Sequence, residues 1–118
     1  MAKVLKKTTG LTGIAVSKDP KFELDKLYRR ILKVLSTLPQ ESAYKRNTEK
    51  LIREKHEVIQ QTNDVAVIEE KIGCGQAEEV IIQAKNELAL VEQMSKFRPW
   101  ERLIEEPPEN QWTWPPHK

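Results

Sequence analysis

Apolar side chains recur every three or four residues over three long stretches of the chain, which is the period of an α-helix with one buried face. The first stretch follows Asp19-Pro20, a typical helix start, because aspartate caps the first turn and proline fits the first helical position. Pro39 ends this helix, since a proline disfavours helical geometry in the residue before it. Its apolar positions are Leu24, Leu27, Ile31, Leu35 and Leu38, widened by Tyr28 and Leu32.

A second helix is predicted over residues 41–61. Its apolar stripe is weaker than that of the first helix, and Lys55 interrupts it, so this helix is expected to be half-buried at best. The stripe consists of Tyr44, Leu51 and Val58, widened by Thr48, Ile52 and Ile59.

Two breaks separate the second helix from the last one. Thr62-Asn63-Asp64 ends the second helix and caps a short one, which Gly73-Cys74-Gly75 ends in turn. The last helix is predicted over residues 76–96, where acidic residues in the first turn and basic residues at the end suit the helix dipole. Val65, Ile68 and Ile72 share a face of the short helix, and one side of the last helix carries Ala77, Val80, Ile81, Ala84, Leu88, Val91 and Met94.

No segment alternates with a period of two, so no sheet is predicted. The expected fold is all-α: a small antiparallel helical bundle of three main helices and a short one over residues 19–98. Residues 1–18 form an extended basic arm. Residues 99–118 hold five of the seven prolines and form an extended tail, partly polyproline II.

The chain has 118 residues, enough for one domain. Its residues are 38% hydrophobic and 32% charged, a composition that predicts a thin core which partners help to complete. The apolar runs are too short for a transmembrane helix. The single cysteine, Cys74, allows no internal disulfide, which fits a reducing compartment.

Charge divides the chain into two halves. Residues 1–60 carry a net charge of +7 and residues 61–118 a net charge of −5, which favours faces of opposite sign for different partners over a nucleic-acid footprint. The basic half leaves an alternative open, a soluble adaptor that binds an anionic membrane or RNA. The arm has no acidic residue before Asp19, so it is either a solvated basic segment or part of an import signal.

Two stretches resemble motifs with chemistry and fail on one residue each. Residues 73–78 begin like a glycine-rich phosphate loop, but Glu78 replaces the third glycine and no strand precedes it. Residues 56–60 (HEVIQ) match the zinc motif HExxH except that Gln60 replaces the second histidine, and glutamine is a poor zinc ligand. Neither a nucleotide nor a metal site is predicted.

The remaining reactive groups do not form a catalytic set. Cys74 has acidic neighbours and no histidine nearby in the sequence, so it is interpreted as an incidental turn residue. Successive helical residues point about 100° apart, so the carboxylates of Glu69-Glu70 and of Glu78-Glu79 cannot converge on a substrate. These pairs are interpreted as solvated faces or docking contacts. No catalytic residue and no cofactor is predicted, and the chain is not expected to be an enzyme.

The aromatic tail is the strongest candidate for a functional surface. Trp112 and Trp114 stand two residues apart, so on an extended strand they share a face. The tail can fold back on the bundle, remain disordered or dock on another protein. Docking is favoured because tryptophan is a common interface anchor and proline lowers the entropy lost on binding. The predicted docking residues are Trp100, Trp112, Trp114, Pro99, Pro107, Pro108 and Pro115, with Lys6 and Lys7 of the arm as a second contact.

Three separated blocks of the sequence resemble a known family. They are residues 5–11 (LKKTTGL), residues 76–88 (QAEEVIIQAKNEL), and the tail segments 98–101 (RPWE), 105–108 (EEPP) and 111–115 (QWTWP). The chain resembles the thirteen-kilodalton accessory subunits of mitochondrial respiratory complex I, an NADH:ubiquinone oxidoreductase. The resemblance spans essentially the whole chain. At Cys74 the family usually has glycine, so no family role passes to that thiol.

The resemblance implies a nuclear-encoded subunit that enters the mitochondrial matrix without a typical cleaved presequence. It implies a place on the matrix side of the inner membrane, in the peripheral arm near the quinone-reducing module. There the family has no redox centre and helps to assemble or stabilise the arm. The implied partners are the thirty-kilodalton iron–sulfur-protein core subunit and the forty-two-kilodalton alpha-subcomplex subunit.

Overall fold

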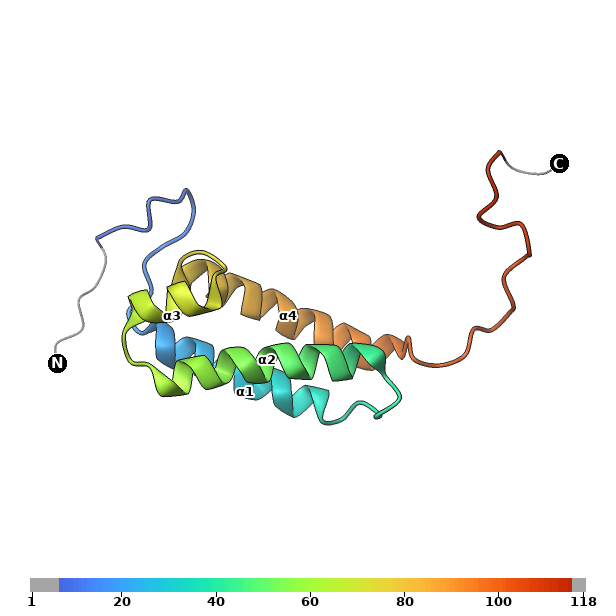
Figure 1. The fold of residues 1–118 in the computed structure, drawn as a ribbon, viewed down its shortest axis with the longest axis horizontal. Coiled ribbons are helices and arrows are strands. Elements are labelled where there is room, and N and C mark those ends of the chain that lie inside the picture. The colour runs from blue at the N-terminus through green and yellow to red at the C-terminus, as the bar shows by residue number, and fades with distance from the viewer. Residues whose placement is uncertain (1–6, 116–118) are drawn as a thin grey trace.

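Four helices make up the folded part of the chain (Figure 1). The computed structural model describes residues 7–115, and within this range there is no strand. The helices are α1 (Pro20–Leu35), α2 (Ala43–Gln61), α3 (Val65–Ile72) and α4 (Ala77–Phe97). The all-α prediction, with three long helices and a short one, is confirmed.

Helix α1 lies between the other two long helices and contacts both along its length. Figure 1 shows α2 running antiparallel to α1, whereas α4 runs in the same direction as α1. Helix α3 sits at the end of the bundle where α1 begins, and it contacts both α2 and α4. The bundle therefore depends on one central helix with two flanking helices.

Each of the first three helices begins at a residue whose side chain caps the exposed backbone N–H groups. Asp19 precedes Pro20, as the sequence predicts. The cap oxygens accept hydrogen bonds at Asp19 from the Phe22 N–H (3.3 Å), at Ser42 from the Lys45 N–H (3.2 Å) and at Asp64 from the Ala66 N–H (3.0 Å). Gly73 ends α3 at φ 70°, a conformation that glycine adopts without a steric penalty.

The core is a single cluster with α1 at its centre. Leu24, Ile31 and Leu35 have no exposed surface, and Tyr28 is only 1% exposed. The other helices contribute mainly β-branched side chains and alanine. The buried apolar residues are Leu24, Tyr28, Ile31, Leu35, Leu38, Ile52, Ile59, Ile68, Ala77, Val80, Ile81, Ala84 and Val91.

The predicted stripe of α2 is wrong in part. Leu51 is 56% exposed, while Lys45 and Thr48 are buried together with Ile52 and Ile59. The buried face is thus turned by about one residue from the one predicted. Because α2 packs mainly on α1 and α3, only a narrow face of it is covered, and one leucine is left in solvent.

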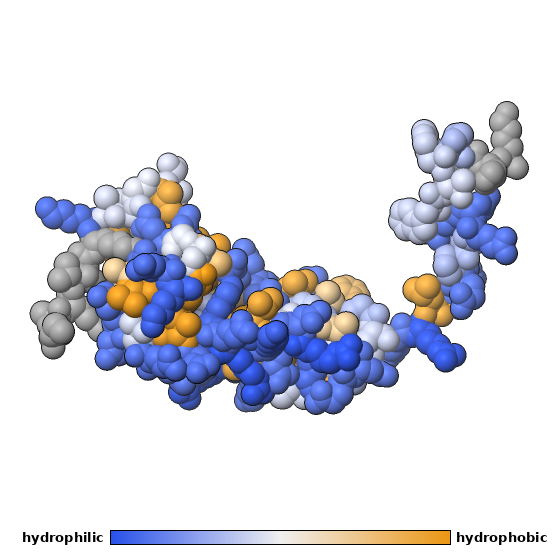
Figure 2. All heavy atoms as spheres, in the orientation of Figure 1, coloured by the Kyte–Doolittle hydropathy of each residue, from blue (hydrophilic) through white to orange (hydrophobic). Residues whose placement is uncertain are grey.

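The arm and the tail extend the molecule well beyond the bundle. The chain measures 67 × 33 × 21 Å with a radius of gyration of 19.1 Å, whereas a compact 100-residue domain has about 13 Å. Figure 2 shows a largely hydrophilic surface with apolar patches near the arm and along the part of the bundle where α4 runs. Among residues 7–115, no helix is long and apolar enough to span a bilayer.

Replacing Ile31 by alanine should lower the free energy of unfolding by about 2–5 kcal/mol, because the side chain is fully buried and leaves a cavity in α1. Urea denaturation followed by circular dichroism measures the change. Leu51→Ala is the matched control, and a loss of about 1 kcal/mol or less is expected there. Equal losses in the two variants would contradict the assigned core.

Candidate docking site

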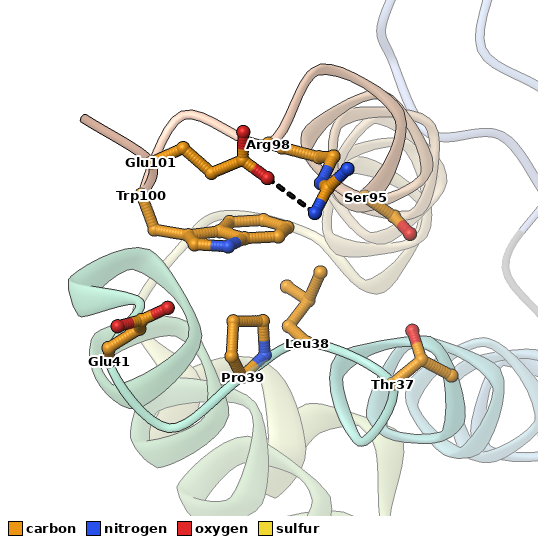
Figure 3. A pocket seen from close by; sticks show the side chains of 8 residues that line it. All are labelled: Thr37, Leu38, Pro39, Glu41, Ser95, Arg98, Trp100 and Glu101. Atoms are coloured by element: carbon orange, nitrogen blue, oxygen red, sulfur yellow. Dashed lines mark ion pairs between the residues drawn. The ribbon is translucent and has the colours of Figure 1, made fainter. Parts of the chain in front are cut away.

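The start of the tail is attached to the bundle by Trp100. This residue is half-buried and packs against the core cluster. Figure 3 shows its indole ring lying over Pro39 and facing Leu38, in the loop that joins α1 to α2. The ring borders a hollow of about 470 Å³. The rest of the lining consists of Thr37, Glu41, Ser95, Arg98 and Glu101.

Arg98 sets the direction in which the chain leaves α4. It is left-handed, at φ 59° and ψ 52°, and its N–H donates to the Met94 carbonyl at 3.0 Å. This conformation costs a residue other than glycine about 1–2 kcal/mol. The Arg98 guanidinium pairs with Glu101 at 2.5 Å, and the Glu101 N–H donates to the Arg98 carbonyl at 3.2 Å. These contacts, together with Trp100, hold the turn.

Beyond Glu101 every described residue of the tail is exposed. The largest apolar side chains there are Leu103 (73% exposed), Ile104 (101%), Trp112 (90%) and Trp114 (86%). The structure therefore does not bring the three tryptophans together: Trp100 lies on the bundle, and the other two lie out in solvent. Among the predicted docking prolines, Pro99, Pro107, Pro108 and Pro115 are also exposed.

The far end of the tail is not one straight strand. The Gln111 N–H donates to the Pro108 carbonyl and the Thr113 N–H to the Asn110 carbonyl, both at 3.1 Å. Proline and asparagine both favour such turns. Trp112 and Trp114 are predicted to share a face on a fully extended chain, and the turns at Pro108 and Asn110 depart from that geometry. The shared face therefore stays a prediction.

The N-terminal arm contacts the start of α4. The Gln76 side chain donates from Nε2 to the Thr9 carbonyl at 2.6 Å, and Thr9 is only 6% exposed. The Thr9 hydroxyl in turn donates to the Ile14 carbonyl at 2.7 Å. Lys7 is exposed, whereas Lys6 lies outside the described residues.

Glu78 is a structural residue that the sequence did not reveal. Its interpretation as a solvated or docking carboxylate is wrong, because it is only 4% exposed and its Oε1 accepts from the Ser17 N–H at 3.3 Å. No periodic pattern signals this contact, since the two residues are 61 positions apart in the chain. The arm covers a carboxylate that the helix alone would expose.

A carboxylate of the chain itself lies at the helix start that follows the glycine-rich turn. An anion at a helix N-terminus is held by the free backbone N–H groups of the first turn. Here the Glu79 carboxylate accepts from the Gln76 N–H at 2.8 Å, so the chain supplies its own anion at that place. Cys74 is exposed in the turn, and within residues 7–115 no group of three or more potential ligands could hold a metal ion.

His56 pairs with a carboxylate on α1. Its Nε2 lies 2.7 Å from Asp25 Oδ1, and its ring meets the Tyr28 ring edge-on, with centroids 6.4 Å apart. Burial alone would raise the pKa of Asp25, but hydrogen bonds from His56 and Arg29 and the charge of Arg29 outweigh it and lower that pKa. The pair joins α1 to α2.

A second polar pair joins α2 to α4. The Tyr44 hydroxyl donates to Glu87 Oε1 at 2.5 Å. Burial raises the pKa of Tyr44 strongly, and the hydrogen bond to Glu87 raises it further. The phenol therefore keeps its proton at neutral pH, and the pair acts as a link between helices.

The comparisons with known proteins identify the family. Residues 13–79 match the family described as "ETC complex I subunit conserved region". The Bos taurus protein named NADH dehydrogenase (ubiquinone) 1 alpha subcomplex subunit 5 is 49% identical over 115 residues, which cover 98% of this chain and 99% of the relative. The chain belongs to the family of these alpha subcomplex subunits 5.

More distant members of the family match as well. The Mus musculus protein of the same name is 46% identical over 115 residues, covering 98% of this chain and 99% of the relative. The probable subunit 5 of Caenorhabditis elegans is 43% identical over 110 residues, which cover 93% of this chain and 73% of the relative. Because the mammalian matches extend over almost the whole chain, they include the tail as well as the bundle.

Replacing Asp25 by asparagine tests its link to His56. A carboxylate with a lowered pKa in the folded protein stabilises it at pH values above the unfolded-state pKa, and this stabilisation is lost as the pH falls through the folded-state pKa. The variant should thus be less stable at pH 7, by about 1 kcal/mol or less. It should also lose less stability than the unmodified chain between pH 5 and pH 3. Urea titrations across this range measure both, and parallel losses would contradict the assignment.

Tryptophan fluorescence checks the different surroundings of the three indoles. The double variant Trp112→Phe/Trp114→Phe retains only Trp100, which should emit at shorter wavelength and be quenched less by acrylamide, because it is half-buried. The Trp100→Phe variant is the counterpart and should be quenched readily. Equal quenching of the two variants would show that Trp100 does not lie on the bundle.

Proposed function

We propose that this chain is a non-catalytic accessory subunit of mitochondrial respiratory complex I. The match to relatives named as subunits of NADH dehydrogenase (ubiquinone), over 98% of the chain, carries the proposal. The subunit lies on the matrix side of the inner membrane, in the peripheral arm near the quinone-reducing module. It stabilises the arm or assists its assembly.

The polar groups of the structure support a role without catalysis. The pairs His56–Asp25 and Tyr44–Glu87 connect helices, and Glu79 occupies the start of α4. Each of these groups is explained by its contacts within the bundle. We therefore expect the chain to act on other proteins through its surfaces.

The tail is the main docking element in this proposal. Trp112 and Trp114 anchor it to a neighbouring subunit, while the prolines limit the freedom that the tail loses on binding. Trp100 keeps the tail's origin at one end of the bundle, so the two exposed indoles search a restricted volume. The proposed neighbours are the thirty-kilodalton iron–sulfur-protein core subunit and the forty-two-kilodalton alpha-subcomplex subunit. The arm, with Lys6 and Lys7, provides the second contact.

A basic adaptor is the alternative function, supported by the net charge of +7 over residues 1–60. Within the bundle, however, carboxylates lie among the basic side chains of this half and pair with some of them. Arg29 pairs with Asp25 at 3.0 Å and Arg53 with Glu49 at 2.5 Å. An adaptor for anionic lipid or RNA needs a continuous basic patch, which these pairs interrupt.

Replacing both Trp112 and Trp114 by alanine should reduce incorporation into complex I by at least about tenfold, because a buried interface tryptophan commonly contributes 2 kcal/mol or more. The variants are expressed as full chains in cells that lack the endogenous subunit. A native gel of detergent-solubilised mitochondria, stained for NADH dehydrogenase activity and probed for the chain, measures incorporation.

Phe22→Ala is the control for that experiment, because Phe22 is an exposed aromatic residue of α1, at 63% exposure, outside the tail. It should incorporate normally, and the helix content of the double variant should be unchanged. Normal incorporation of the double variant would contradict docking through the tail. Migration of the unmodified chain only as a small free species would instead favour the adaptor.

A further inference from the structure

The outward side of α4 carries no charge over about four turns, in a chain whose residues are 32% charged. At 100° per residue, the positions concerned fall within an arc of about 100°, on the side away from the buried Val80, Ala84 and Val91. All of them are exposed, and three are large apolar residues. This surface, named here the outer stripe, consists of Ile82 (41% exposed), Asn86, Ala89, Leu90 (42%), Gln93 and Phe97 (70%).

The other long helices have the charged outer faces expected of solvent-exposed helices. Exposed charged residues cover α1 at Lys26, Arg29, Arg30 and Lys33, and cover α2 at Arg46, Lys50, Arg53, Glu54 and Glu57. A helix that is uncharged on two opposite sides is expected where both sides are buried, and the bundle covers only one side of α4. Figure 2 shows apolar atoms exposed along the part of the bundle where Figure 1 places α4.

We propose that the outer stripe docks one amphipathic α-helix of a neighbouring subunit. From Ile82 to Phe97 the stripe is about 22 Å long, and its width suits the apolar side of a single helix. The facing side of that helix must itself be uncharged, because an unpaired charge buried against Leu90 would lose its hydration without compensation. This inference rests on the proposed function for the identity of the assembly.

The borders of the stripe define the partner further. On the side facing α2, the polar groups are engaged within the bundle: Gln83 accepts from Lys55 at 3.2 Å, and Glu87 accepts from Tyr44. The opposite border carries Lys85, Glu92 and Lys96, all exposed.

Lys96 marks the edge of the stripe, since its Nζ lies 6.0 Å from the centroid of the Phe97 ring. Charge complementarity then requires a partner helix whose flank along this border presents acidic, basic and acidic residues in turn.

The stripe and the tail lie on one continuous path. The stripe ends at Phe97, and the turn at Arg98 follows directly. A helix docked along α4 would therefore reach the point where the tail leaves the bundle. One partner can therefore supply the helix that docks on α4 and also contact the tail.

The test introduces a charge into the stripe of the full-length chain. Leu90→Glu should reduce incorporation into the megadalton complex by at least about tenfold, because the carboxylate would be buried against an uncharged helix. Leu51→Glu is the matched control: it makes the same substitution at a more exposed leucine of α2, at 56% exposure. That variant should incorporate like the unmodified chain. Circular dichroism and thermal unfolding of the purified variants check that both fold.

A second variant keeps the proposal falsifiable if Leu90→Glu folds poorly. Ala89→Arg preserves helix propensity and places a charge halfway along the stripe, so it should reduce incorporation in the same way. Normal incorporation of folded Leu90→Glu or Ala89→Arg would overturn docking at the stripe and leave the proposed function intact.

Two further outcomes would also overturn the inference. Absence of the unmodified chain from the megadalton band would refute the proposed function and the docked helix together. If the purified unmodified chain is a dimer that Leu90→Glu dissociates, then a second copy covers the stripe and the partner proposed here is wrong. Analytical ultracentrifugation of both proteins distinguishes this case.

Discussion

Burial of α1 between α2 and α4 is the interaction on which the rest of the structure depends. Leu24, Ile31 and Leu35 lose all of their exposed surface there, and both flanking helices pack mainly on α1. The hydrophobic effect therefore acts mainly through one central helix. The polar links of His56 and Tyr44 connect neighbouring helices around this core, and they align helices that the core already holds together.

Because the core is small, much of the chain lies outside it, in the arm and the tail. The arm returns to the start of α4, where Thr9 and Glu78 are buried, while the tail leaves from the opposite end of the bundle (Figure 1). Among the tail residues that the structure describes, Trp100 alone packs against the core cluster. Its position over Pro39 connects the tail to the loop between α1 and α2. The exposed indoles beyond it are thus attached to a defined point of a folded body.

The two candidate contact surfaces differ in physical character. The tail presents isolated large side chains on a segment without helix or strand among its described residues, so fixing them on a partner would carry an entropic cost. The outer stripe of α4 is already rigid, and binding there costs little conformational entropy. A subunit with both surfaces can bind its partner firmly through the outer stripe and be positioned on that partner by the tail. This combination suits an accessory protein whose function depends on surfaces.

Much of the fold could be predicted from the sequence because it depends on local chemistry. The period of three to four residues identified the helices, Asp19-Pro20 and Gly73 marked helix boundaries, and the prolines placed the tail outside the bundle. Family membership was also readable, since three blocks of residues match in order. The face of α2 was predicted less well: Thr48, Ile52 and Ile59 were included, but Leu51 was wrongly assigned to the core.

Only the tertiary structure decided the contacts between residues that are distant in the chain. The sequence determined which segments are helical and that all three tryptophans lie in a proline-rich tail beyond the helices. It could not show that Trp100 differs from Trp112 and Trp114, that Glu78 is covered by the arm, or that the bundle leaves the outer stripe of α4 exposed. Each of these depends on which surface a neighbouring segment covers, and periodicity along one helix does not contain that information.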